Sequence, residues 1–361
     1  MKHQTIKYSK CENRAYSQLN RLPLLIIVLL FPTMSNACQL FYPMLQKTLA
    51  DRLIESENVV MVRTSADSDR LFHVKNILKG EDLPVAIEQY VPLAFRNFIS
   101  VDPDYTIVMI QRENGQDWLP LGVARRGNYE QLVKQIIDNK HWIANKRDDI
   151  DRLLVFAKLL GNQDLRIHEL AYLEVARAPY EMIMEVSQSV DLPTMRNTLN
   201  NFNYANWHGL ATLILGSSSE KQDEEWLSNE LQSKHKFQIS RNLAAVVTAW
   251  IEMKSTQGLD EIISLYIKDQ TRTEVEIEEI ILALSTHANA TPALQDEVVD
   301  IYSRLLKRNP KLVTRITKDL VTWKRWDLVN QYQQSKLVLQ SDLRSQILIN
   351  TYLNAAISYQ R

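Results

Sequence analysis

Two short segments of the chain combine aromatic rings with polar or cationic side chains, the residue types that bind sugars, peptides and other polar ligands. The first, Trp323-Lys-Arg-Trp326, places two indole rings three residues apart. The second, Asn201-Phe-Asn-Tyr-Ala-Asn-Trp-His208, crowds three asparagines and three aromatic rings in front of an apolar run. One candidate binding surface is therefore Trp323 with Trp326, and another is formed by Asn203, Tyr204, Trp207 and His208.

The same rings also fit a packing role. On a helix, Trp323 and Trp326 share one face with Leu320, as the residues of a buried stripe do. Aromatic side chains also pack against the first turns of helices, and the segment 201–208 directly precedes an apolar run. We favour packing for both segments and keep binding as the alternative hypothesis.

The residue patterns of well-known catalytic and metal sites are missing from the sequence. His168-Glu169 begins a zinc-protease signature, but Tyr172 stands where the second histidine is needed. The seven histidines stand apart, so a metal site would need ligands from distant helices. Asp164 and His168 lie one helical turn apart, which suits an N-cap aspartate beside a surface histidine better than an acid–base pair. No catalytic residue, metal ligand or cofactor is predicted.

Residues 1–37 have the organisation of a secretory signal peptide. Five basic residues and one acidic residue accompany an apolar run at residues 22–31, and small residues follow at Ser35 and Ala37. As a helix this run reaches about 15 Å, half of a hydrocarbon core of roughly 30 Å. We therefore expect cleavage between Ala37 and Cys38 and export, with the periplasm as the destination. A membrane anchor at residues 22–31 is the alternative.

Cys38 would be the first residue of the exported chain. Lipid-modified bacterial proteins also begin with cysteine, although they usually carry leucine where this chain has Ser35. Cys11 would leave with the signal peptide, so Cys38 is expected to be either a free thiol or a lipidation site. Contact with a membrane is predicted only through such a lipid or through an uncleaved signal.

The charge balance argues against nucleic acid as a partner. The whole chain has 42 basic and 43 acidic residues. Without the five basic residues and one acidic residue of the signal peptide, the exported chain carries a net charge of −5. A mildly acidic chain lacks the basic footprint that nucleic acids and anionic lipid surfaces require.

Glycine and proline divide the sequence into two parts with different patterns. Both are frequent between Cys38 and Gly127 and sparse afterwards. The sequence therefore predicts an α+β multidomain chain with a small β-rich domain at 38–127, a linker or connecting helix at 128–149, and a helical domain at 150–361. In the first part we expect a helix at 44–54, a hairpin turn at 113–116, and strands at 59–64, 70–77, 85–91, 105–111 and 118–124.

The second part shows helical periodicity from beginning to end. Apolar residues recur every three or four positions from Ile150 to Leu160, and Thr273 and Glu276 are spaced as a capping box. Thr291-Pro292 and Asn309-Pro310 each place an N-cap candidate before a proline that suits the first helical position. A series of short helices with short polar links predicts an α-solenoid of stacked helical hairpins.

Two segments carry a family resemblance. Phe72-His-Val-Lys-Asn-Ile-Leu-Lys-Gly80, downstream of the cysteine at the expected new N-terminus, resembles a strand of small netrin-like (OB-type) domains. Arg166-Ile-His-Glu-Leu-Ala171 resembles part of a HEAT-type repeat. These resemblances imply a small OB-type barrel over 38–127 and HEAT-like repeats over 150–357, and neither supplies catalytic residues.

From these features we expect an exported protein that binds another protein or acts as a scaffold. The alternative is an enzyme that acts on envelope polymers, with its active site at the junction of the two domains.

Overall fold

The computed structural model describes residues 47–64, 68–101, 105–111, 115, 117–125 and 127–359. The expected signal peptide (1–37) and Cys38 lie outside these residues. Within the described part of the chain, no helix combines the length and the apolar character needed to cross a membrane.

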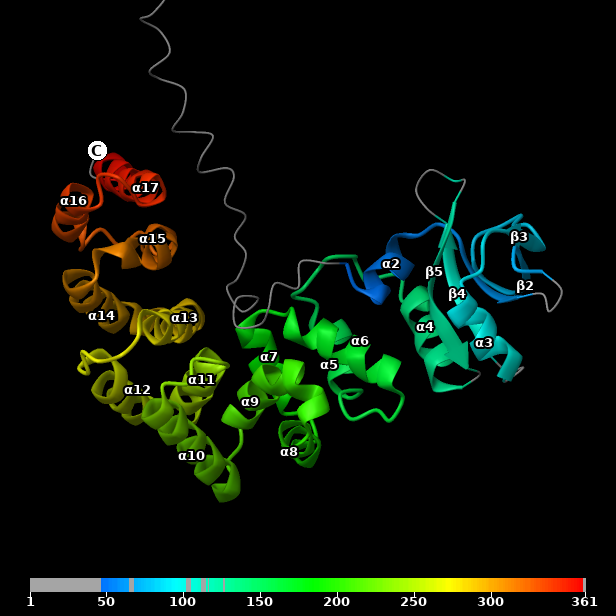
Figure 1. The fold of residues 1–361 in the computed structure, drawn as a ribbon, viewed down its shortest axis with the longest axis horizontal. Coiled ribbons are helices and arrows are strands. Elements are labelled where there is room, and N and C mark those ends of the chain that lie inside the picture. Colours follow the sequence, from blue (N-terminus) through cyan, green and yellow to red (C-terminus); the bar gives the residue numbers. More distant parts are fainter. Residues whose placement is uncertain are drawn as a thin grey trace, which may run out of the picture. The chain divides into compact units, whose positions relative to one another are not determined.

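The first part of the fold is a small antiparallel half-barrel (Figure 1). A short helix, α2 (Leu49–Glu55), precedes it, and its strand order is β3-β2-β1-β4-β5. The strands are β1 (Val59–Thr64), β2 (Leu71–Lys79), β3 (Ala86–Glu88), β4 (Tyr105–Gln111) and β5 (Trp118–Arg125). The five strands confirm the sequence-based expectation, although β3 is shorter than residues 85–91. A helix that the sequence did not indicate, α3 (Leu93–Val101), follows β3.

Two turns fix the register of these strands. Gly80 ends β2 with a φ of +104°, and a side chain at this position would collide with Asn58. At the expected hairpin, Gln111 of β4 pairs with Trp118 of β5, and Gly115 between them has a φ of +70°. Residues 112–114 and 116 of that turn lie outside the described part of the chain.

The central strand β1 is buried on both faces of the sheet. Val60 and Val62 face a small core that includes Phe72 of β2 and Ile107 of β4. Val59 and Met61 belong to a second core on the opposite face, which continues into the helices. Because side chains alternate along a strand, the run of β-branched residues serves two separate hydrophobic cores.

The second core crosses the segment where the sequence indicates a domain boundary. Helix α4 (Asn128–Asp138) contributes Leu132 and Val133 to it, and α5 (Ile150–Ala157) contributes Phe156. The cluster extends as far as Leu215. The expected connecting segment 128–149 thus contains a helix that packs against both sides, while the division into domains at 38–127 and 150–361 stays a prediction.

The rest of the chain is helical, as the sequence predicts. The helices are α5 (Ile150–Ala157), α6 (Leu165–Ala176), α7 (Tyr180–Ser187), α8 (Leu192–Asn200), α9 (His208–Gly216), α10 (Lys221–Phe237), α11 (Leu243–Lys254), α12 (Thr256–Ile262), α13 (Glu274–Ala290), α14 (Gln295–Arg308), α15 (Val313–Thr322), α16 (Val329–Val338) and α17 (Leu343–Tyr359). Short turns η2 (Phe202–Trp207), η3 (Ile263–Ile267), η4 (Pro292–Leu294) and η5 (Pro310–Leu312) lie between some of them.

Polar caps begin several of these helices. Thr273 and Glu276 form the predicted capping box of α13. The Asn309 side chain accepts a hydrogen bond from the backbone amide of Lys311, which confirms it as a cap, here of η5 leading into α15. Thr291 precedes η4 without a side-chain cap, so this expected cap is wrong. Pro292 is the first residue of a short 3₁₀ helix, and α14 begins directly after this helix.

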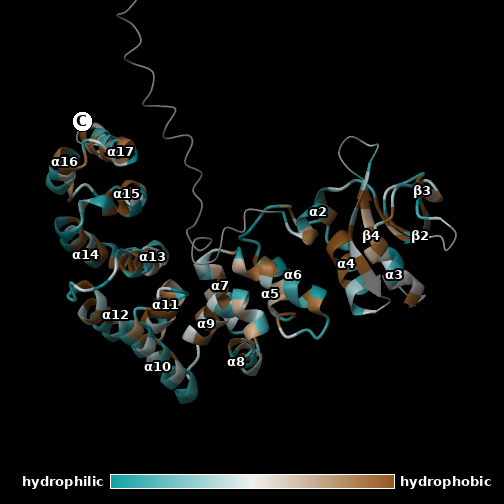
Figure 2. Ribbon diagram, viewed as in Figure 1, coloured by the Kyte–Doolittle hydropathy of each residue, from teal (hydrophilic) through white to brown (hydrophobic). Residues whose placement is uncertain are grey.

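The odd-numbered helices from α5 to α17 form a continuous row in which each helix contacts the next (Figure 1). Helices α9 and α11 approach each other closely at Gly216, where a Cβ would lie 2.7 Å from the Cα atom of Ala249. Helix α11 is buried along most of its length, whereas α10 beside it is mostly hydrophilic (Figure 2). The described helices thus pack against one another along the row, and their buried apolar side chains form separate hydrophobic clusters.

Candidate functional site

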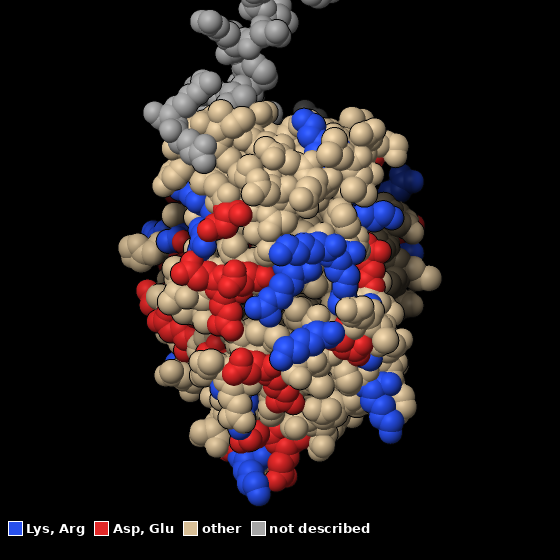
Figure 3. Space-filling view, turned by 90° about the vertical axis from the view of Figure 1, so that its left-hand side faces the viewer, with Lys and Arg blue, Asp and Glu red and all other residues tan. Residues whose placement is uncertain are grey.

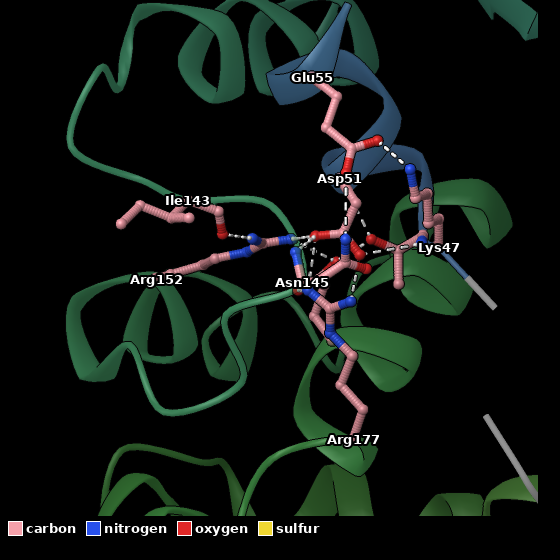
Figure 4. A network of polar contacts seen from close by, with 9 residues as sticks. Lys47, Asp51, Glu55, Ile143, Asn145, Arg152 and Arg177 are labelled. Atoms are coloured by element: carbon pink, nitrogen blue, oxygen red, sulfur yellow. Dashed lines mark hydrogen bonds and ion pairs between the residues drawn. The ribbon is translucent and has the colours of Figure 1, made fainter. Parts of the chain in front are cut away.

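A buried network of four charged side chains joins α2 to the helical part of the chain (Figure 4). Asp51 comes from α2, Arg152 from α5, Glu174 from α6, and Arg177 from the residue that ends α6. All four are at most 4% exposed. Charged side chains are rarely buried to this extent unless each is paired with an opposite charge.

Each charged group in this network pairs with both groups of opposite charge. Arg152 Nη2 donates to Asp51 Oδ1 and to Glu174 Oε1, both at 2.9 Å. Arg177 Nη2 donates to Asp51 Oδ1 at 3.0 Å and to Glu174 Oε2 at 2.9 Å, and its Nη1 bonds to Asp51 Oδ2. Two carboxylates and two guanidinium groups therefore cancel in charge, and each guanidinium bridges both acids.

Neutral groups complete the surroundings of the two carboxylates. The Thr48 hydroxyl donates to Glu174, and the backbone amides of Thr48 and Asn145 donate to Asp51 at 3.2 and 3.0 Å. Arg152 Nη1 donates to the carbonyl oxygen of Ile143 at 3.2 Å. Thr48 and Asp51 also form the capping box of α2, so the motif that starts this helix also aims its carboxylate into the network.

The electrostatic balance keeps Asp51 ionised. Burial alone raises the pKa of a carboxyl group, but here the hydrogen bond and charge of Arg177, the Asn145 amide and the charge of Arg152 outweigh it. The pKa of Asp51 is consequently held well below its usual range. The ionised carboxylate of Asp51 accepts hydrogen bonds from two arginines and so holds α2 against α5 and the end of α6 as a clamp.

This clamp bears on the alternative hypothesis of an enzyme at the domain junction. The junction does hold two neighbouring carboxylates, Asp51 and Glu174, which paired-acid chemistry would need. Their side chains are 0% and 1% exposed, and both are bonded to guanidinium groups. Carboxylates that do not meet solvent and whose oxygens are bonded to guanidinium groups are placed to stabilise the fold.

A second polar cluster connects α7, α11 and α13 in the odd-numbered row. The Tyr180 hydroxyl donates to Glu252 Oε2 at 2.6 Å. His287 Nδ1 lies 4.0 Å from the same oxygen, and its Nε2 lies 2.9 Å from the carbonyl oxygen of Thr248. Burial raises the pKa of Tyr180 and lowers that of His287, so both side chains are held neutral. A protonated phenol is a hydrogen-bond donor and a poor nucleophile. We therefore interpret this cluster as a structural link between three helices.

The segment that the sequence singled out at 201–208 folds into η2 and the start of α9. The Tyr204 ring lies 4.7 Å from the ring of His168, and the Trp207 ring lies 5.2 Å from that of Tyr172. His208 Nε2 lies 3.2 Å from the carbonyl oxygen of Asn201. Asn203 is exposed. The structure thus brings Tyr204 and Trp207 onto α6 and leaves Asn203 at the surface.

His168 occupies a different environment from the one expected. Asp164 is the predicted N-cap of α6, and its carboxylate pairs with Arg166. The expected surface position of His168 is wrong, because the side chain is only 4% exposed and packs between Tyr172 and Tyr204. Burial lowers the pKa of His168, and its Nε2 has no hydrogen-bond partner among the described residues.

Trp323 and Trp326 both pack against the hydrophobic core of the last helices, although not from one helix. Helix α15 ends at Thr322, so the expected shared helical face with Leu320 is wrong. Trp323 stacks on Tyr302 at 6.1 Å and donates from Nε1 to Asn289 Oδ1 at 2.8 Å. Trp326 lies in the following turn, and its ring contacts those of Tyr352 and Tyr359.

No group of three histidine, cysteine or acidic side chains is arranged to hold a metal ion among the residues that the structure describes. Comparison of the chain with protein-family models, with curated proteins and with solved structures gives no match.

Proposed function

We propose that this chain is an exported protein that binds other proteins through stacked helical hairpins. The observation that carries the proposal is the continuous row of odd-numbered helices, in which each helix contacts its neighbours in the series. Solenoids are built from such nearest-neighbour contacts, and they present long surfaces suited to protein partners.

The polar clusters support this role because they serve to hold the row together. The cluster of Tyr180, Glu252 and His287 links three helices of the row, and the four charges around Asp51 lock its first helices to α2. A rigid row of helices is a preorganised surface, and preorganisation reduces the entropy that binding costs.

Export to the periplasm forms part of the proposal and rests on residues 1–37. Cleavage before Cys38 leaves only a short segment ahead of α2. Helix α2 is in turn fixed to the helical part by the buried network around Asp51. If Cys38 carries a lipid, α2 therefore becomes the attachment point through which the helices are held at a membrane surface.

Cross-linked affinity capture from envelope fractions tests the proposal. The tagged protein is mixed with the fraction, cross-linked, purified and analysed by mass spectrometry, with an excess of untagged protein as the matched control. We expect one or a few proteins that the untagged competitor removes. Capture of envelope polymer fragments in place of protein would contradict the proposal and favour the enzyme hypothesis.

A further inference from the structure

Helix α14 carries an unusual division of charge along its solvent-facing side. Acidic side chains occupy its first half at positions 296, 297 and 300, and basic side chains occupy its second half at positions 304, 307 and 308. At about 100° per residue all six positions fall on one side of the helix. The opposite side is buried in the core through residues that include Val298, Ile301 and Leu305.

Most of these charges are available to a partner. Among the described residues, Glu297, Asp300, Arg304 and Lys307 make no ion pair. Asp296 pairs with Arg325 but is 87% exposed. The Arg308 guanidinium reaches only backbone carbonyls, the nearer one, that of Asp269, at 3.1 Å.

Acidic and basic side chains are also separated on this side of the molecule. Figure 3 looks onto the side of the molecule on which α14 lies in Figure 1. At middle height, acidic side chains gather on one side of this view and basic side chains on the other.

The charges on α14 are also placed symmetrically about position 302. Asp300 and Arg304 lie on either side of it, and the acidic positions 296 and 297 lie as far before it as the basic positions 307 and 308 lie after it. A two-fold axis that crosses α14 at this height turns a second helix antiparallel to the first. Each acidic half then faces a basic half, with Asp300 opposite Arg304 of the second copy.

We propose that the exposed side of α14 is a self-association surface on which two copies of this chain meet in antiparallel fashion. Isologous interfaces require a patch that complements itself, and a helix side with opposite charges on its two halves meets this requirement. Ion pairs between exposed side chains are individually weak, so the dimer is weak and sensitive to salt. The proposal concerns a second copy of this chain and does not depend on the partner in the proposed function.

Sedimentation velocity of the exported chain over a range of concentrations tests the proposal. We expect dimers at about 50 mM salt, and an association constant lowered roughly tenfold or more at about 500 mM, where the Debye length is shorter. Two charge-reversed variants sharpen the test: R304E/K307E, in which the exposed side is acidic, and E297K/D300K, in which it is basic. Each variant alone should be monomeric, and the two mixed in equal amounts should form dimers.

The variant E225K, on an exposed position of α10, is the matched control and should dimerise like the unchanged chain. Circular dichroism should show that all variants fold, since every substituted side chain is at least partly exposed. A single monomeric mass for the unchanged chain at low salt would overturn the proposal. So would dimers of R304E/K307E alone, or a mixture of the two variants that stays monomeric.

Discussion

Replacing Asp51 with alanine tests the buried clamp most sharply. The carboxylate accepts hydrogen bonds from both arginines and from the backbone amides of Thr48 and Asn145. Its removal leaves two guanidinium groups facing one carboxylate in a site closed to water. Breaking a buried ion pair from one side costs about 3–5 kcal/mol, because the remaining charge is left uncompensated.

Urea unfolding followed by far-ultraviolet circular dichroism measures this loss. With a denaturant slope of about 3 kcal/mol/M, Asp51→Ala should lower the unfolding midpoint by about 1 M or more. Hydrogen exchange gives a local reading, since the amides of α2 should lose protection before those of α11.

Glu55→Ala is the matched control on the same helix. Glu55 pairs with Lys47 at 2.6 Å, but the two side chains are 32% and 46% exposed. Loss of a surface pair costs at most about 1 kcal/mol. If the urea midpoint of Asp51→Ala falls no further than that of Glu55→Ala, the network does not clamp α2.

Three further predictions concern other parts of the chain. Burial raises the pKa of Asp319 from 3.8 to about 6, so the favourable contribution of its protonated form to folding is complete below pH 3.8 and is lost as the pH rises through 6. In the variant Asp319→Asn this fall in stability of roughly 3 kcal/mol should be absent. If the urea midpoint changes with pH in the same way in both proteins, the prediction is wrong. Trp326→Ala should lower the stability of the helical part by about 3 kcal/mol through a cavity, with Trp323→Ala similar or milder, and unchanged urea midpoints would point to a ligand surface in place of packing. The intact mass of protein from the envelope fraction should correspond to a chain that begins at Cys38. A mass that includes residues 1–37 would refute cleavage, and an added diacyl mass would establish lipidation.

The secondary structure was largely predictable because it depends on local pattern. Strands at 59–64 and 105–111 were predicted with the bounds that β1 and β4 have, since runs of valine and isoleucine flanked by polar residues favour extended chain. Helix α3 was missed because it is only nine residues long and lies between Pro92 and Pro103, in a part of the chain where frequent proline and glycine indicated short strands and turns. Strand β3 is short because only Leu71, Phe72 and His73 of β2 pair with it, and no local pattern reveals how many residues of two strands will pair.

The buried clamp was not predictable from local pattern. Asp51 is separated from Arg152 by 101 residues and from Arg177 by 126 residues, so only the tertiary fold brings them together. The sequence shows the charge of Arg152 within a periodic helix but not that its side chain is buried. His168 was misplaced for the same reason, because the ring that covers it comes from Tyr204 on another element.

Site-specific photo-cross-linking tests the proposed function most directly. A photoreactive amino acid is placed at exposed positions of the odd-numbered row, Glu185 of α7 and Thr322 of α15, and at exposed positions of even-numbered helices, Gln222 of α10 and Gln333 of α16. After irradiation of intact cells, the odd-numbered positions should form covalent adducts with the same protein, and the even-numbered positions should not. Adducts to no protein from Glu185 and Thr322, or equal adducts from all four positions, would contradict it.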